Sequence, residues 1–199
     1  MYITINKKQY KLPSGYATMR WAQYLKIHDV VTDIELLHRL TDVPLDELNK
    51  ATDIEAFNHA MLLLSFLKEP VPQEKKPELY LLSQSKTLMF PKNFNEVTLG
   101  QYEDMKQILA SEMATLDKVT KIVAIGATFH LVGDYSLKHL DKVEARVMEC
   151  SVQSVIATYN FFLTRLKLSK NGTPNIVRKA IIQMRNVWQA LMSWMHTAF

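Results

Sequence analysis

The sequence predicts an α+β protein that is predominantly α-helical, with two related β-hairpin-plus-helices modules and a C-terminal helical hairpin. Of its 199 residues, 48% are hydrophobic, which is enough for a packed core. Only five glycines occur, whereas barrels and sandwiches need many tight turns. The ten methionines also favour helices, because Met is a good helix former that fills irregular core space.

Two short segments have the pattern of a β-hairpin. Residues 1–12 read "MYITINKKQYKL", with strand-like runs on either side of a polar turn. Residues 79–90, "LYLLSQSKTLMF", repeat this arrangement. Pro13 and Pro91 follow directly, and a proline cannot continue a central strand.

The two hairpins open two copies of one longer pattern, which align without a gap at an offset of 78 positions. In this alignment "LPSGYATMRWAQY" matches "FPKNFNEVTLGQY". Gln23 and Tyr24 then meet Gln101 and Tyr102, and each copy becomes helical after this pair. We interpret the pattern as an internal duplication, in which the Gln-Tyr pairs belong to the scaffold.

Helix signals follow in each copy. In the first copy, Asp42 is a predicted N-cap with Pro44 in the first turn, and Asp53 is predicted to cap a further helix. The second copy predicts a helix near 98–124, an irregular stretch over 125–136 and a long helix near 136–168.

The expected domain organisation follows from these patterns. Module 1 covers residues 1–68, and module 2 covers residues 79–168. Residues 69–78, "EPVPQEKKPE", form a proline-rich linker, and residues 169–199 form a C-terminal amphipathic docking helix.

The C-terminal helix is predicted to have two apolar rows. One steps along Val177, Ile181, Met184, Trp188, Leu191 and Met195, and "NGTPN" at 171–175 turns the chain into it from the preceding helix. A second row makes the stripe wider than one partner helix requires. The expected protein-interface residues on this segment are Trp188, Trp194, Met195, Phe199, Ala180 and Val187. The stripe could instead close the core of the same chain.

Charge is distributed unevenly. The net charge is +4, yet residues 150–199 contain no acidic side chain. Such a basic end can face nucleic acid, an anionic membrane or an acidic protein, or can be a solvated helix face. The residues that could contact DNA or an acidic partner are Arg165, Lys167, Lys170, Arg178, Lys179 and Arg185.

No pattern indicates catalysis, a metal site or a cofactor. The six histidines are scattered without ligand spacing, and no phosphate-binding glycine loop or GxSxG is present. Cys150, the single cysteine, falls in an apolar run and is expected to be a small core residue. With no signal segment and no apolar run of spanning length, we expect a soluble protein of intracellular origin that is not an enzyme.

Residues 36–67, "LLHRLTDVPLDELNKATDIEAFNHAMLLLSFL", resemble a helical module of tail assembly chaperones from tailed bacteriophages. Leu40–Thr41, Val43–Pro44, Leu48 and Phe66–Leu67 carry the match, and Asp42 stands where that family usually has Gly. The phrase that ends in Gln-Tyr is similar to small virion proteins of Bacteroides phages, including crAss-like phages.

This resemblance implies a non-enzymatic role in phage morphogenesis. The leading expectation is a structural subunit of the portal, neck or tail, assembled as a homo-oligomeric ring with other virion proteins. The chain would be made in the host bacterial cytoplasm and end in the virion, without membrane contact. The alternatives are a tail assembly chaperone that leaves the mature particle and a virion or cargo protein that contacts DNA non-specifically.

Overall fold

The computed structural model describes residues 2–5, 7–50, 53–72, 78–88, 96–133 and 135–168. Within these ranges the chain forms eight α-helices and two antiparallel two-stranded sheets. The predicted fold class, α+β and predominantly α-helical, is confirmed. The domain boundaries stay a prediction, and the second arm of the C-terminal helical hairpin lies outside the described residues.

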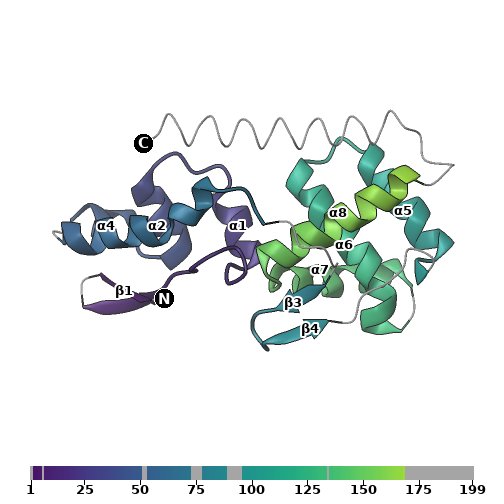
Figure 1. The fold of residues 1–199 in the computed structure, drawn as a ribbon, viewed down its shortest axis with the longest axis horizontal. Helices are drawn as coiled ribbons and strands as arrows, with labels where there is room; N and C mark the ends of the chain where they lie inside the picture. The colour runs from purple at the N-terminus through teal and green to yellow at the C-terminus, as the bar shows by residue number, and fades with distance from the viewer. Residues whose placement is uncertain are drawn as a thin grey trace.

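Module 1 contains one hairpin and a group of short helices (Figure 1). The Ile3 and Ile5 side chains of the hairpin are buried, while Tyr2 and Thr4 face solvent, as the two-residue period of a strand requires. The elements, in order, are β1 (Tyr2–Ile5), β2 (Lys8–Lys11), α1 (Trp21–Ile27), α2 (Asp33–Thr41), α3 (Leu45–Asn49), α4 (Ile54–Leu63) and the 3₁₀ turn η1 (Ser65–Lys68).

Module 2 is built around one buried helix, α6, which contacts α5, α7 and α8 (Figure 1). Ten residues of α6 are buried, so it is apolar on most of its circumference. The elements, in order, are β3 (Leu79–Leu81), β4 (Lys86–Leu88), α5 (Leu99–Ala110), α6 (Thr115–Val132), the 3₁₀ turn η3 (Leu137–His139), α7 (Leu140–Met148) and α8 (Val152–Leu168).

The helix boundaries of module 2 differ from the sequence expectation. The helix expected over 98–124 is interrupted after Ala110, and the stretch 125–136 is helical as far as Val132. Ser111 turns to an extended conformation, and the Lys118 ammonium donates to the carbonyl oxygens of Leu109 (3.3 Å) and Ser111 (2.6 Å). These bonds satisfy carbonyl groups that the end of α5 leaves without a helical partner.

The long helix expected over 136–168 is also interrupted, between Met148 and Val152. One face of α8 is buried along its length, at Val152, Val155, Tyr159, Phe162 and Leu166. The interruption is explained by backbone pairing. The Ser151 N–H donates to the Tyr80 carbonyl (2.9 Å), and the Cys150 carbonyl accepts from the Trp21 N–H (2.8 Å).

Segment 149–152 therefore joins the two modules, and we call it the joint. On one side it makes bridges to β3, and on the other it pairs with Arg20, where the Val152 N–H also donates to the Met19 carbonyl (2.9 Å). A continuous helix would use these backbone groups internally. At the joint these backbone N–H and C=O groups instead form hydrogen bonds with distant parts of the chain.

The two hairpins share position but not register. Both turns carry a left-handed residue at the equivalent place, with φ of 66° at Lys7 and 48° at Ser85. The last β1–β2 pair is Ile5 with Lys8, whereas the last β3–β4 pair is Leu81 with Lys86, so the second turn is two residues longer. An even change keeps each side chain on its original face.

The repeated Gln-Tyr phrase begins a helix in both modules. Gln23 accepts a hydrogen bond from the Arg20 N–H (3.1 Å), and Gln101 accepts one from the Thr98 N–H (2.9 Å). In each case the glutamine is the third helical residue and its side chain returns to the N-cap, which satisfies a backbone donor left open at a helix start. The geometry agrees with the interpretation of these glutamines as scaffold.

The duplicated positions have diverged in burial. Trp21 is 0% exposed, whereas the equivalent Leu99 is 77% exposed. The Trp21 indole N–H donates to the Thr120 hydroxyl (2.8 Å), and its ring stacks on Tyr24 with centroids 5.4 Å apart. The first copy of the phrase thus packs against module 2, while its counterpart begins a helix at the surface.

Asp42 ends α2 rather than capping α3, so the expected N-cap is wrong. Its φ of 57° is left-handed, and its N–H donates to the His38 carbonyl (2.8 Å). Pro44 occupies the N-cap position of α3 instead. Asp53 does cap α4, accepting from the Ala56 N–H (2.9 Å). A left-handed residue favours glycine, so glycine would fit the backbone at position 42 better than most other residues.

We expect Asp42→Gly to have a free energy of unfolding higher than Asp42→Ala by about 1 kcal/mol, because Ala pays the left-handed penalty. Chemical denaturation of both variants measures the difference. Asn58, exposed within α4, is the matched control, where Ala should be more stable than Gly by about 1 kcal/mol. The same order of Ala and Gly at both positions would contradict the assignment.

Candidate functional site

Most of the interface residues expected from the sequence lie outside the described residues. This holds for Trp188, Trp194, Met195, Phe199, Ala180 and Val187, and for the basic residues Lys170, Arg178, Lys179 and Arg185. Lys167 lies in α8, without a described side chain. Arg165 is exposed on α8, and its guanidinium carbon lies 5.7 Å from the centroid of the Phe161 ring.

Cys150 and two of the described histidines make structural contacts. Cys150 is buried at the joint, not within a helix, and burial together with the nearby Glu149 carboxylate raises the pKa of its thiol to about 12. His28 and His38 bond the carbonyl oxygens of Leu25 (2.6 Å) and Val43 (2.7 Å). Across the described ranges, no group of three His, Cys, Asp or Glu side chains is placed to hold a metal ion.

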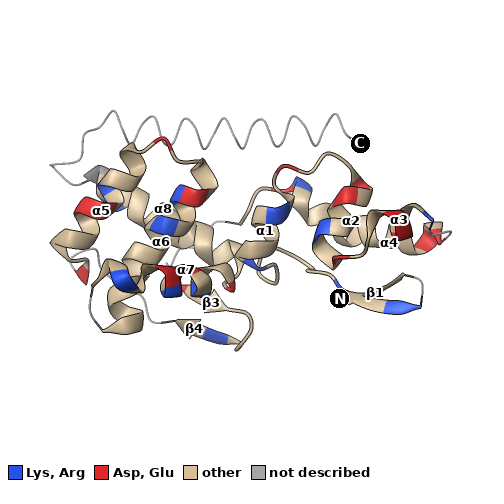
Figure 2. Cartoon of the chain, turned by 180° about the vertical axis from the view of Figure 1, so that it is seen from behind, with Lys and Arg blue, Asp and Glu red and all other residues tan. Residues whose placement is uncertain are grey.

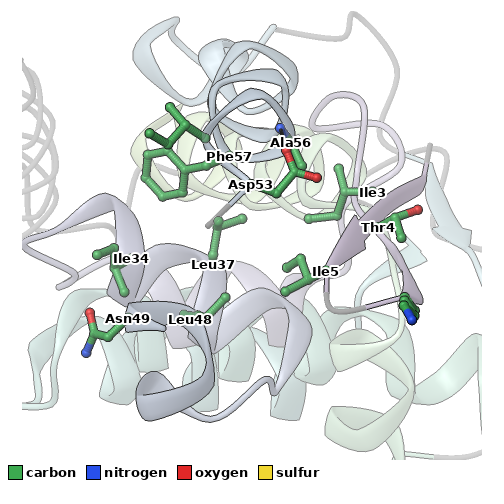
Figure 3. Close-up of a pocket in the computed structure, with 12 residues that line it drawn as sticks. Ile3, Thr4, Ile5, Ile34, Leu37, Leu48, Asn49, Asp53, Ala56 and Phe57 are labelled. Carbon is green, nitrogen blue, oxygen red and sulfur yellow. Dashed lines mark hydrogen bonds between the residues drawn. The ribbon is translucent and has the colours of Figure 1, made fainter. Parts of the chain in front are cut away.

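Module 1 contains an apolar groove of about 390 Å³ between its hairpin and helices α2, α3 and α4 (Figure 3). Ile3 and Ile5 form one wall, Ile34 and Phe57 form the other, and Leu37 lies between them. The remaining lining residues are Thr4, Lys7, Leu48, Asn49, Asp53, Ile54 and Ala56. A space of this size and character is typical of sites that receive apolar ligands or side chains.

Local structure explains why apolar side chains meet here. The strand alternation turns Ile3 and Ile5 inward from β1. Ile34 and Leu37 are three residues apart on α2, and this spacing places them on one helix face. The Asp53 cap fixes the start of α4, which brings Ile54 and Phe57 to the groove.

The mouth of the groove has an exposed apolar side chain, and the helices beside it carry exposed acidic side chains. Ile54 is 70% exposed at the mouth although it is a large aliphatic residue. Asp46 and Glu47 of α3 and Glu55 of α4 are also exposed. Figure 2 shows acidic residues on α2, α3 and α4 and basic colouring on the hairpin, which carries Lys7, Lys8 and Lys11.

Sequence reasoning missed this groove, although most of its helical lining lies in segment 36–67. The apolar spacing of α2 and α4 reads as ordinary core in the sequence. One signal for the groove was present in the sequence. Ile54 directly follows the N-cap Asp53, and a large apolar residue at an exposed helix start indicates a contact surface.

Among the described residues, no helix is long and apolar enough to cross a membrane. Comparison with known proteins found no matching family model, curated protein or solved structure.

Proposed function

We propose that this chain is a non-enzymatic structural subunit of a tailed-phage virion that acts through protein–protein contacts. The supporting observation is the apolar groove of module 1 with its exposed Ile54. Exposed apolar surface of this kind is characteristic of proteins that bind other proteins.

A second candidate, a tail assembly chaperone, is supported by the location of the groove. Leu37, Leu48 and Phe57 line it and belong to the segment that resembles tail assembly chaperones. An apolar groove between short helices suits the capture of an amphipathic segment from a client protein.

Mass spectrometry of purified particles separates the two candidates. A structural subunit is expected in mature particles at a fixed ratio to the other virion proteins. Abundant protein in infected cells with none in the particles would contradict the structural proposal and favour the chaperone. Negative-stain micrographs of the purified protein provide a second readout, since a ring subunit is expected to form closed assemblies.

A further inference from the structure

We propose that the groove of module 1 receives the C-terminal segment, residues 174–199, of a second copy of this chain. The proposal rests on the proposed function as a virion subunit and names the contact that would link one subunit to the next. The groove supplies the receptor, and the charge of the two surfaces, together with the length of chain beyond α8, identifies the occupant.

The groove has the form of a receptor for the anchors of an amphipathic helix. Its floor is buried at Leu37 and Leu48, while its mouth is open at Ile54. About 390 Å³ is too small for a whole helix but accommodates large side chains from one helix face. Helices that dock in this way present apolar residues at spacings of three and four.

The helices beside the groove are predominantly acidic, whereas its hairpin wall is basic. Residues 33–69, which include α2, α3 and α4, carry eight acidic and three basic side chains, and residues 2–11 carry three lysines and no acidic side chain. Asp53 lines the groove on the helical side, and Lys7 lines it on the hairpin side. A partner segment with basic residues and no acidic ones would be attracted to the helical side and oriented by it.

The C-terminal segment has the matching pattern. Residues 174–199 contain Arg178, Lys179 and Arg185 and no aspartate or glutamate. The sequence predicts a helix whose apolar row steps by four and three residues from Val177 to Met195, with Trp188 near its middle. Tryptophan is enriched among the residues that dominate the binding energy of interfaces.

The path of α8 favours the C-terminal segment of a second copy, not that of the same chain, as the occupant of the groove. Helix α8 begins beside Met19 and extends through module 2, while β1 and α4 lie at the opposite end of the molecule (Figure 1). A straight helix over 174–199 would be about 39 Å long at about 1.5 Å per residue. Starting from the far end, its first anchors, Val177 and Ile181, would stay beside module 2.

A segment from a second copy has no such restriction and can place any part of its apolar row, including Trp188, over the groove. The resulting contact is head-to-tail, because the groove of one subunit meets the tail of the next. Contacts of this type close into a ring when the rotation between subunits permits it.

Cross-linking of two single-cysteine variants of the full chain tests the proposal. In a Cys150→Ala background, one chain carries Asn49→Cys, at an exposed polar residue of the groove, and the other carries Gln189→Cys, next to Trp188, so that the apolar contacts are kept. After mixing and mild oxidation, we expect a disulfide-linked heterodimer that contains one chain of each kind. Its absence from the mixture would overturn the proposal, including the case in which a chain with both cysteines forms only an internal disulfide.

Self-association of cysteine-free charge variants gives a second test. In sedimentation experiments, Ile54→Lys is expected to weaken self-association at least about tenfold, because it adds a positive charge at an apolar contact with a basic segment. The matched control is Leu62→Lys, since Leu62 is 69% exposed on the same helix but does not line the groove. Equal effects of the two changes, or a monomeric unmodified protein at all concentrations, would overturn the docking.

These results separate the docking from the virion assignment. Protein found in mature particles without a cross-link between copies would overturn the docking and leave the proposed function supported. Protein absent from particles that still cross-links between copies would contradict the proposed function alone.

Discussion

Trp21→Ala is expected to lower the free energy of unfolding by about 3 to 5 kcal/mol. The indole is fully buried, donates a hydrogen bond to the Thr120 hydroxyl and stacks on Tyr24, so its removal leaves a cavity between the two modules. Such a loss is a large share of the stability of a small protein. Chemical denaturation followed by circular dichroism measures it.

Leu99→Ala is the control, because residue 99 occupies the duplicated position and is 77% exposed. Its effect on the free energy of unfolding should stay within about 0.5 kcal/mol. Trp21→Phe separates packing from hydrogen bonding, since it keeps an aromatic ring and removes the indole N–H; we expect a loss of about 1 to 2 kcal/mol. Similar losses for Trp21→Ala and Leu99→Ala would contradict the burial of Trp21 between the two modules.

Gly126→Ala is expected to destabilise the protein by at least about 2 kcal/mol, although Ala is the better helix former by about 1 kcal/mol. Gly126 lies in α6, and a Cβ atom there would overlap the ring of Phe162 on α8 far inside van der Waals contact. The Gln101 amide also approaches this point, donating to the Ile125 carbonyl (2.6 Å). Thermal and chemical unfolding of the variant measure the loss.

Two further variants make this prediction specific. Gly15→Ala is the control, because a Cβ added at Gly15 would meet no described atom within 4 Å beyond its chain neighbours, and the stability should stay unchanged or rise slightly. Combining Gly126→Ala with Phe162→Leu should lose less stability than the two single changes added together, because the smaller side chain makes room. Additive losses would mean that Gly126 and Phe162 do not contact each other.

The elements set by local chemistry could be predicted from the sequence. The hairpins follow from short alternating runs around polar turns, and the Asp53 cap follows from its position before an apolar-periodic stretch. The two helix starts at Trp21 and Leu99 coincide with the duplicated Gln-Tyr phrase, because a glutamine at the third helical position can return to the N-cap.

The helix interruptions could not be predicted, because they depend on contacts between distant residues. The break between Met148 and Val152 is stabilised by backbone bonds to Tyr80 and Trp21, neither of which is near it in sequence. The left-handed Asp42 was missed for a related reason. An aspartate two residues before a proline is typical of an N-cap. In the structure, the Asp42 N–H donates to the His38 carbonyl, and Asp42 therefore ends α2.

The groove was missed because its walls come from four separate elements. Ile3 and Phe57 each fit an ordinary amphipathic pattern, and only the packing of the hairpin against α2, α3 and α4 leaves a space between them. The expected tail residues, by contrast, follow from periodicity alone, and their part in binding stays a prediction.

The joint also constrains the order in which the chain can fold during synthesis. The hairpin and helices of module 1 emerge first from the ribosome, but Trp21 meets Thr120 across 99 residues of sequence. Its backbone partner Cys150 emerges later still. Until that point Trp21 lacks the partners that bury it, so the elements of module 1 expose an apolar surface when they first form. Helix α8 follows the joint in sequence and packs on α6, so the joint and the core of module 2 are completed together, after module 1.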